Sequence, residues 1–392
     1  MKKIKILVDA RVLEGEGQGS ATYIKGLYNA LAQKHPEQYD IYITGYTFDK
    51  LQEHFPFLEY SRFIQLERCS TIKRLFVEFP NILKAGDFDY AHFQYIVPFR
   101  GKGRCRFIVT IHDILFNDFP EEFSAFYRVS RNFLFQQALQ KSEIVLTVSN
   151  YSKERIAAFY KADPNRIHIT PNAIDQRYLA PYDKIQSIQY VRDSFEFGNY
   201  ILYVSRVEPR KNHHLLLKAF RELQLWKQGI HLVCIGNETL KNPLFDQQIE
   251  DMRPEEKVAF RWIKYVNDHD LLELYRAARL FVYPSKAEGF GIPPIEAAAL
   301  AVPTLCSRST AMEDFDFLGV QHQFDPAQYK HFKDNLQNAI ARPFPPSYWQ
   351  KIAQEVTRRY SWQVAADVLH DRIQAVQQQE SHPTTSGHSI AS

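Results

Sequence analysis

The chain has 392 residues, of which 45% are hydrophobic and 24% are charged, and its formal net charge is +3. This balance excludes a disordered or fibrous protein, and the length favours two domains over a single core. No apolar run reaches the roughly 18 residues that a membrane span needs, and the first residues lack a signal-peptide pattern, so we expect a cytoplasmic protein. The four cysteines have no metal-ligand spacing and are expected to be free thiols.

The positive charge is concentrated in the first half of the chain. Residues 1–184 contain 25 Lys and Arg against 21 Asp and Glu, or +4, and the remainder contains 23 against 24, or −1. Four cations fall within seven residues, namely Arg100, Lys102, Arg104 and Arg106. They favour contact with an anionic membrane surface or a phosphorylated acceptor, and the alternative is a solvated loop. Residues 62–79 mix apolar and basic side chains, which is typical of an amphipathic helix on anionic lipid or of a core helix.

Short β-rich segments alternate with helical patterns along the chain. The first half has helical patterns at 20–34 and 122–141 and β-rich segments at 3–10, 40–46, 89–95, 106–114, 143–149 and 166–174. After a polar stretch, the second half has helical patterns at 212–226 and 362–378 and β-rich segments at 200–207, 231–236, 258–266, 279–285 and 302–307. Strands that alternate with helices predict parallel, doubly wound sheets, and there are two such series.

The predicted fold class is therefore α/β, with two Rossmann-like domains that face each other across a cleft. We expect a first domain at 1–184, completed by the helix 361–379, and a second domain at 185–360. The last residues, 380–392, have no periodicity and are expected to be disordered. Sheets of this kind bind ligands at the carboxyl ends of their strands, so functional residues should directly follow strands.

The most informative segment is Glu288-Gly-Phe-Gly-Ile-Pro-Pro-Ile-Glu296, which follows one predicted strand and begins a helical run. Gly289 and Gly291 allow a close approach of backbone to a ligand, and a helix start is a natural seat for a diphosphate. The two carboxylates would then accept hydrogen bonds from hydroxyl groups. The alternative for Glu296 is that it merely complements the helix dipole.

Two further segments follow predicted strands. Ser205-Arg-Val-Glu-Pro-Arg-Lys-Asn212 offers Arg206 and Lys211, which together could neutralise a pyrophosphate leaving group without a metal ion; otherwise it is a basic surface turn. In the first half, Thr110-Ile-His-Asp113 places His112 at a strand end. A lone histidine at such a position is more often structural, and Asp113 could cap the next segment or hold the imidazole tautomer.

Glycines 15, 17 and 19 lie between the first strand and the first helix. Their spacing differs from the dinucleotide-binding pattern G-x-G-x-x-G, so we interpret this segment as an acceptor-side loop, with a flexible turn as the alternative.

Together these segments resemble glycosyltransferase family 4, the retaining enzymes with the B-type fold of two Rossmann-like domains. The resemblance rests on the E-x7-E segment, on SRVEPRKN, on THD after a strand of the first half and on PNAID at 171–175. It implies a donor site in which Glu288 and the backbone from Gly289 through Phe290 and Gly291 to Ile292 hold the sugar. Glu296 would hold the ribose, and Arg206 and Lys211 the diphosphate.

The resemblance implies further roles for residues of both halves. His112 would contact the transferred sugar, and Lys264, Tyr265 and Val266 would lie near the nucleobase. The acceptor side would include Gly17, Gly19, Asp113 and Asn172. Turnover would need no metal and no cofactor beyond the nucleotide-sugar donor, and His112, Arg206, Lys211 and Glu288 would be the catalytic set.

The expected function is transfer of a hexose, with mannose from GDP-mannose preferred over UDP-sugars, to a glycan or lipid-linked acceptor of a bacterial cell-surface polysaccharide. Contact with the inner face of a membrane is an added possibility, and no nucleic-acid partner is expected. Alternatives are a non-catalytic nucleotide-sugar-binding homologue, a glycoside hydrolase with two carboxylates, and a metal-dependent transferase. The last would use one of three Asp-x-Asp triplets, Asp87-Phe-Asp89, Asp268-His-Asp270 or Asp314-Phe-Asp316.

Overall fold

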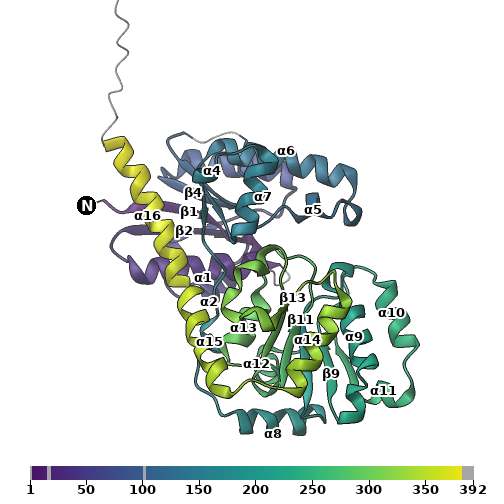
Figure 1. Cartoon of the computed structure of the whole chain (residues 1–392). Coiled ribbons are helices and arrows are strands. Elements are labelled where there is room, and N and C mark those ends of the chain that lie inside the picture. The colour runs from purple at the N-terminus through teal and green to yellow at the C-terminus, as the bar shows by residue number, and fades with distance from the viewer. Residues whose placement is uncertain (1, 16–18, 100–102, 382–392) are drawn as a thin grey trace, which may run out of the picture. The chain divides into compact units, whose positions relative to one another are not determined.

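The computed structural model describes residues 2–15, 19–99 and 103–381, which form two compact units (Figure 1). Unit 1 consists of Met1–Ala173 and Trp362–Ser392, and unit 2 of Ile174–Ser361. The predicted domain boundary, 184/185, falls at the first residue of helix α8 (Lys184–Phe195) in unit 2. Gly17, two cations of the basic cluster and residues 382–392 of the predicted tail lie outside the described residues.

Unit 1 is built on a parallel sheet of seven strands in the order β3-β2-β1-β4-β5-β6-β7. The strands are β1 (Ile4–Asp9), β2 (Tyr39–Gly45), β3 (Phe63–Gln65), β4 (Tyr90–Gln94), β5 (Arg106–Thr110), β6 (Ser142–Thr147) and β7 (Ile167–Ile169). Every pairing is parallel, and the strand order reverses between β1 and β4. This confirms the doubly wound sheet predicted for the first half.

The helices of unit 1 include both that were expected in its first 173 residues, as α1 and α6. Each of α6 and α7 begins after a serine whose side chain accepts an N–H of the first turn, Ser124 for α6 and Ser149 for α7. The helical elements are α1 (Gly19–Lys34), α2 (Phe48–His54), α3 (Thr71–Lys73), the π-helical turn η3 (Arg74–Glu78), α4 (Phe79–Ala85), α5 (Leu115–Asp118), α6 (Ala125–Lys141), α7 (Asn150–Tyr160) and α16 (Trp362–Ser381).

Two expectations concerned segments of unit 1: an amphipathic helix at residues 62–79, and completion of the unit by the C-terminal helix. Residues 62–79 do not form one amphipathic helix, because the segment begins with the edge strand β3 and becomes helical only from Thr71. The C-terminal helix α16 packs against α1, β6 and β7 (Figure 1). The Trp362 ring lies so close to Gly26 of α1 that a Cβ there would come within 2.0 Å of it.

Unit 2 contains a parallel sheet of six strands in the order β10-β9-β8-β11-β12-β13. Its strands are β8 (Tyr200–Val204), β9 (His231–Ile235), β10 (Phe260–Ile263), β11 (Leu280–Tyr283), β12 (Thr304–Ser307) and β13 (Gln323–Phe324). This is the Rossmann order, in which the connections reverse direction between the first and fourth strands. The switch point of unit 2 therefore lies between β8 and β11.

The helices of unit 2 are α8, α9 (His213–Glu222), α10 (Pro243–Glu250), α11 (Pro254–Val258), α12 (Asp268–Ala277), α13 (Ile292–Ala299), α14 (Tyr329–Ala341) and α15 (Pro346–Arg359). The helix expected at 212–226 is α9, which is shorter. Gln224 takes a left-handed conformation with φ of 50°, so the helix ends and a separate 3-10 turn follows at Leu225–Gln228. Short turns also occur at Pro209–Lys211 (η7) and Thr310–Asp314 (η9).

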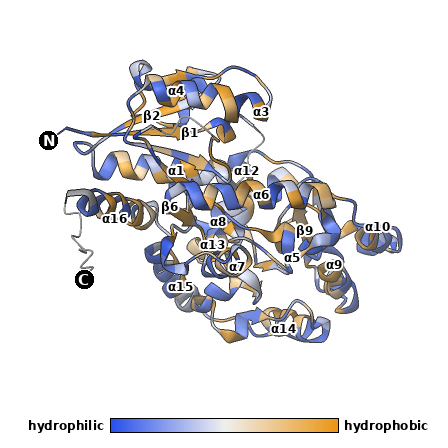
Figure 2. Ribbon diagram, turned by 90° about the horizontal axis from the view of Figure 1, so that it is seen from above, coloured by the Kyte–Doolittle hydropathy of each residue, from blue (hydrophilic) through white to orange (hydrophobic). Residues whose placement is uncertain are grey.

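The central strands of both sheets are buried on both faces, as helix-covered parallel sheets require, whereas the edge strands β3 and β10 are only partly buried or exposed. Figure 2 shows hydrophobic residues concentrated along strands such as β1 and β2. All four cysteines are free, as expected, and three of them are buried. Among the described residues, no helix is both long and apolar enough to cross a membrane.

Candidate functional site

The switch point of unit 2 brings together two loops that are about 80 residues apart in sequence. One loop follows β8 and contains η7, and the other follows β11 and leads into α13. The Lys286 N–H donates to the Arg210 carbonyl at 2.8 Å, and the Asn212 side chain donates to the Pro284 carbonyl at 2.9 Å. The segments Ser205–Asn212 and Glu288–Glu296 therefore belong to one site.

At its centre, Lys211 and Glu288 form a buried ion pair. The Lys211 ammonium contacts Glu288 Oε1, and the Tyr283 hydroxyl donates to the same oxygen at 2.8 Å. The Arg210 guanidinium lies 3.5 Å from Glu288 Oε2 and also donates to the Ala287 carbonyl at 2.7 Å. One carboxylate thus faces two cations and a phenol in a site that is largely shielded from water.

The charges of this cluster follow from its contacts. Burial alone would raise the pKa of Glu288, but the Lys211 ammonium and the Arg210 guanidinium outweigh it and lower that pKa to about 2. Burial lowers the pKa of Lys211, although Glu288 opposes this. Glu288 is consequently a carboxylate at neutral pH, able to accept hydrogen bonds from hydroxyl groups but not to donate a proton.

Arg210 is a site residue that the sequence reasoning missed, because Arg206 was chosen from the same loop. Arg206 is exposed and makes no side-chain polar contact within the described part of the chain. Arg210 instead links Glu208, 2.8 Å away, to the loop that carries Glu288. The signal was present as adjacent Arg and Lys in EPRKN, but only the turn η7 shows that both side chains reach the second loop.

Helix α13 begins at this cluster. Gly291 precedes it with φ of +96°, a conformation that favours glycine, and a Cβ there would touch Met312 and Phe315 at 3.4 Å. Pro293 and Pro294 have no N–H, so Gly291 and Ile292 supply the amide N–H groups at the positive end of the helix dipole. Phe290 is buried, which anchors the stretch from Gly289 to Ile292.

Glu296 lies one turn into the same helix and has an opposite electrostatic setting. The Tyr275 hydroxyl donates to its Oε2 at 3.1 Å. Burial raises its pKa to about 7, against the smaller lowering effects of the Tyr275 hydrogen bond and the Arg177 charge. The two carboxylates of E-x7-E therefore differ, since Glu288 is firmly ionised while Glu296 titrates near neutral pH.

The predicted nucleobase segment, Lys264 to Val266, follows the edge strand β10. Lys264 lies over the Trp262 ring at 5.6 Å, and Tyr265 is 78% exposed. No described contact joins these three residues to Lys211 or Glu288. Gly236, which the sequence reasoning also missed, follows β9 with φ of +140°, and a Cβ there would lie 2.2 Å from the Ser205 carbonyl oxygen. Glycine is thus required where the β8 and β9 loops meet.

In unit 1, His112 follows β5 and is buried. Its Nε2 lies 2.6 Å from Gln94 Oε1, and the Tyr23 ring packs edge-on at 5.0 Å. Burial lowers the pKa of His112 to about 3, so the imidazole is neutral at physiological pH. Gln94, at the end of the neighbouring strand β4, was not predicted, although strand ends of one sheet edge are expected to meet.

The remaining acceptor-side residues of unit 1 are placed as follows. Asp113 Oδ1 accepts the Leu115 N–H at 3.1 Å, although the N-cap residue of α5 is Ile114. Gly19 is the first residue of α1. Asn172 is buried, and its Oδ1 accepts no hydrogen bond from the described residues.

Acidic residues in each of the three Asp-x-Asp triplets have structural partners. Asp89 accepts the Lys5 N–H at 2.8 Å, Asp270 accepts the Tyr190 hydroxyl at 2.6 Å, and Asp316 pairs with Arg359. Within the described ranges, no group of three or more His, Cys, Asp or Glu side chains is arranged to hold a metal ion.

Among the curated proteins that are similar in sequence are two O-antigen chain mannosyltransferases. The O-antigen chain mannosyltransferase B of Escherichia coli is 30% identical over 231 residues, 58% of this chain and 59% of that protein. The O-antigen chain mannosyltransferase RfbU of Salmonella typhimurium is 32% identical over 199 residues, 51% of each. The matches thus span only a little over half the length of these relatives.

A solved structure is similar over a greater length. The Anabaena protein HepE, solved in complex with UDP and glucose, has a TM-score of 0.68 at 15% identity, covering 95% of this chain and 100% of that one. The fold is the expected B-type glycosyltransferase fold of two Rossmann-like domains.

Family models cover both halves of the chain. Residues 17–178 match the model described as Glycosyltransferase Family 4, and residues 188–355 match Glycosyl transferases group 1. Between them they account for most of the sequence. The chain belongs to the glycosyltransferases, with a family 4 domain followed by a group 1 domain.

Proposed function

We propose that this protein transfers mannose from GDP-mannose to a glycan or lipid-linked acceptor during synthesis of a bacterial cell-surface polysaccharide. The similar O-antigen mannosyltransferases of Escherichia coli and Salmonella typhimurium support this choice of sugar and pathway. UDP-sugars are the second choice of donor.

The cluster of Lys211, Arg210 and Glu288 at the start of α13 is the observation that carries the proposal. Two cations and the positive end of a helix dipole converge at the switch point, which suits the diphosphate of a nucleotide-sugar. Glu288, ionised at neutral pH, suits the hydroxyl groups of the sugar. Glu296 suits the ribose diol, and Arg206 adds a third cation from the same loop.

In the proposed reaction, the bond between the anomeric carbon and the diphosphate oxygen breaks. The acceptor oxygen bonds to that carbon on the same face, and its proton passes to the departing diphosphate, so configuration is retained. Lys211 and Arg210 stabilise the negative charge that develops on the leaving group, which removes the need for a metal ion. His112, held neutral by burial, contacts the transferred sugar as a hydrogen-bonding group.

The proposed setting is the cytoplasm, with peripheral contact at the inner face of the membrane where a lipid-linked acceptor would reside. No cofactor beyond the donor is required. Arginine and lysine replace the metal in charge neutralisation, and the paired Asp-x-Asp carboxylates support this view.

Turnover in the presence of a chelator tests the reaction. Purified protein is incubated with GDP-mannose, 5 mM EDTA and extracted lipid-linked glycan, and GDP release and the product's anomeric configuration are measured. We expect release of GDP and an α-mannoside, which retains the configuration of the donor. Dependence on added Mn²⁺ or Mg²⁺, or an inverted product, would contradict the mechanism.

A further inference from the structure

Unit 1 exposes a group of large apolar side chains on two helical segments. On α3 and η3 these are Ile72, Phe76 and Val77, and on α6 they are Phe126, Val129 and Phe133. Phe126 is 84% exposed and Ile72 is 72% exposed. With the partly exposed Phe99, these residues are called the apolar face below.

Stacked aromatic rings make the apolar face continuous. The rings of Phe76 and Phe99 stack with centroids 4.6 Å apart, and those of Phe99 and Phe133 with centroids 6.4 Å apart. Along α6, Phe126, Val129 and Phe133 have the i, i+3, i+7 spacing of one helical stripe. The two helical segments therefore present one surface.

This stripe is distinct from the side of α6 that packs on the sheet. The inward side chains Phe135, Ala138 and Leu139 are buried and belong to the core of unit 1. A helix that only covers a sheet needs one apolar stripe, whereas α6 has a second one made of exposed side chains. A contiguous exposed apolar surface of this kind marks an interaction site.

The charge around the apolar face selects the partner. Segments 71–85, 103–105 and 120–140 contain three acidic residues, Glu78, Glu121 and Glu122, against six cations: Lys73, Arg74, Lys84, Arg104, Arg128 and Arg131. Arg74 pairs with Glu78, and Lys73 with Glu67 of the preceding loop. The surplus favours an anionic partner, and apolar rings bordered by Lys and Arg are the composition that binds the boundary between lipid headgroups and acyl chains.

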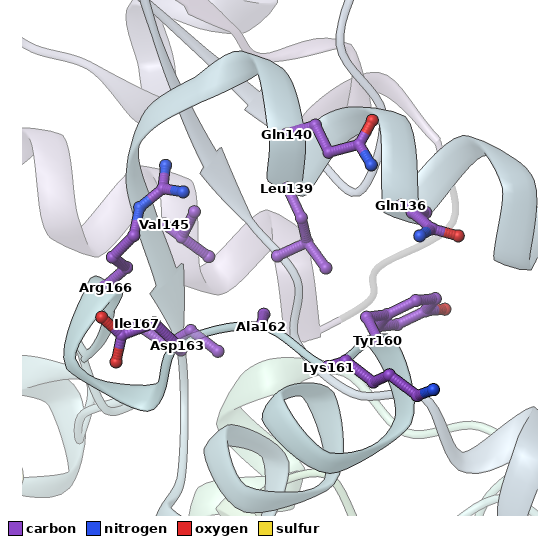
Figure 3. Close-up of a pocket in the computed structure, with 10 residues that line it drawn as sticks. All are labelled: Gln136, Leu139, Gln140, Val145, Tyr160, Lys161, Ala162, Asp163, Arg166 and Ile167. Atoms are coloured by element: carbon purple, nitrogen blue, oxygen red, sulfur yellow. The ribbon is translucent and has the colours of Figure 1, made fainter.

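The polar continuation of the α6 stripe borders a hollow of about 220 Å³ (Figure 3). Gln136 and Gln140, the next residues of the stripe, line one side, and Lys161 and Arg166 contribute further cations. Figure 3 shows the glutamines projecting from α6 on the opposite side of the hollow from Lys161. Asp163 also lines this hollow, so its lining has two cations against one carboxylate beside the polar end of the stripe.

We propose that the apolar face docks unit 1 on an anionic lipid bilayer, with the exposed rings at the headgroup boundary and the surrounding cations on the lipid phosphates. This deepens the membrane contact included in the proposed function and names the surface that makes it. The rings provide the apolar area, and the cations provide long-range attraction that salt screens.

Co-sedimentation of the full chain with vesicles tests the proposal. Vesicles of phosphatidylcholine alone are compared with vesicles that contain 30% phosphatidylglycerol, at low and high salt. We expect binding to the anionic vesicles, weakened by salt, and about tenfold weaker binding for Phe126→Ser/Val129→Ser. The control variant Ile185→Ser/Val258→Ser removes comparably exposed residues of unit 2 and should bind like the unaltered protein.

The variant Val129→Trp gives a second measurement that does not depend on a loss-of-function variant. Its fluorescence should shift to the blue when anionic vesicles are added, because the side chain enters the acyl boundary. Nucleotide-sugar binding is measured on every sample, so failure of docking is separated from failure of the proposed function. Absence of vesicle binding, or unchanged binding by Phe126→Ser/Val129→Ser, would overturn the proposal. The proposal would also be overturned if the unaltered protein formed a concentration-dependent dimer that Phe126→Ser/Val129→Ser abolished and Ile185→Ser/Val258→Ser did not.

Discussion

The pair of Lys211 and Glu288 determines the chemistry of the candidate site at the scale of single residues. Without ligand, each neutralises the other, and an anionic diphosphate would offer Lys211 a second partner. Because the site is shielded from water, electrostatic interactions within it are stronger than at the surface, and the loss of either charge has a large effect on the other. A substitution at either position should therefore affect turnover far more than one at an exposed lysine of the same unit.

Lys211→Ala is expected to lower kcat by at least about 100-fold, since it removes a cation that stabilises the leaving diphosphate. The matched control is Lys218→Ala on α9, whose exposed ammonium lies 3.9 Å from Glu222 and 4.5 Å from the centroid of the Tyr329 ring. Steady-state release of GDP checks both variants. Near-normal turnover by Lys211→Ala would refute the role given to this residue.

The raised pKa of Glu296 predicts that both the stability of the free protein and the KM for the donor change with pH. Its pKa is about 7 in the folded chain against an ordinary 4.5, so the free protein loses stability as pH rises from 4.5 through 7. The ribose diol needs the carboxylate as acceptor, so the KM for the donor should rise as pH falls from 8 to 6. Glu296→Gln should remove both effects, as followed by thermal unfolding and by donor titration. If the KM of Glu296→Gln still rose as pH falls from 8 to 6, as in the unaltered protein, the assignment would be contradicted.

The sequence indicated Lys211 and Glu288 because each lies in a segment that directly follows a predicted strand. It indicated Glu296 because seven residues separate it from Glu288. It did not indicate Arg210, since the contacts of that side chain depend on the 3-10 turn η7, which directs Arg210 toward Ala287 and Glu288. The sequence also could not predict the contact between His112 and Gln94, because this contact depends on the register of β4 against β5.

At the scale of elements, the ends of the strands position the site, and glycine allows them to approach. Gly236 is expected to be the most sensitive glycine of unit 2, because an added Cβ would meet backbone, 2.2 Å from the Ser205 carbonyl. Gly236→Ala should lower the free energy of unfolding by about 3 kcal/mol and raise the KM for the donor by moving the β8 loop.

The control for this prediction is Gly229→Ala. Gly229 also has positive φ, +68°, but a Cβ there would meet nothing within 4 Å. It should cost only about 1 kcal/mol and leave the donor KM unchanged. Urea unfolding and donor titration of the two variants make the comparison. Equal effects would mean that backbone conformation, and not the approach of the two loops, governs this position.

Element types were more predictable than element ends. Short apolar runs predicted the central strands of both sheets, because both faces of such strands are buried, but they did not predict the short edge strands β3 and β13. The helix expected at 212–226 ends early at a left-handed residue, and the segment 62–79 is divided between an edge strand and a helical turn. Neither segment contains a proline or glycine that would have indicated where its regular structure changes.

At the scale of the whole molecule, the chain returns to its first unit through α16. Ala365, Ala366, Leu369 and Ile373 of this helix are fully buried, and Trp362 packs on Gly26. Truncation after Ser361 should destabilise unit 1 strongly, as each lost Leu or Ile burial costs about 1.5–3 kcal/mol, and should spare unit 2. Hydrogen exchange followed by mass spectrometry measures each unit separately. Equal protection of the unit 1 strands in the full and truncated chains would disprove this role.

The central claim is that the switch point of unit 2 binds the diphosphate of a nucleotide-sugar. The most direct measurement is calorimetric titration of GDP-mannose, UDP-glucose and ADP-glucose into the protein in EDTA, repeated with Lys211→Ala. We predict binding without metal, tightest for GDP-mannose, and a loss of at least tenfold in affinity in the variant. If no nucleotide-sugar binds, or if Lys211→Ala binds as tightly as the unaltered protein, the site is assigned to the wrong residues.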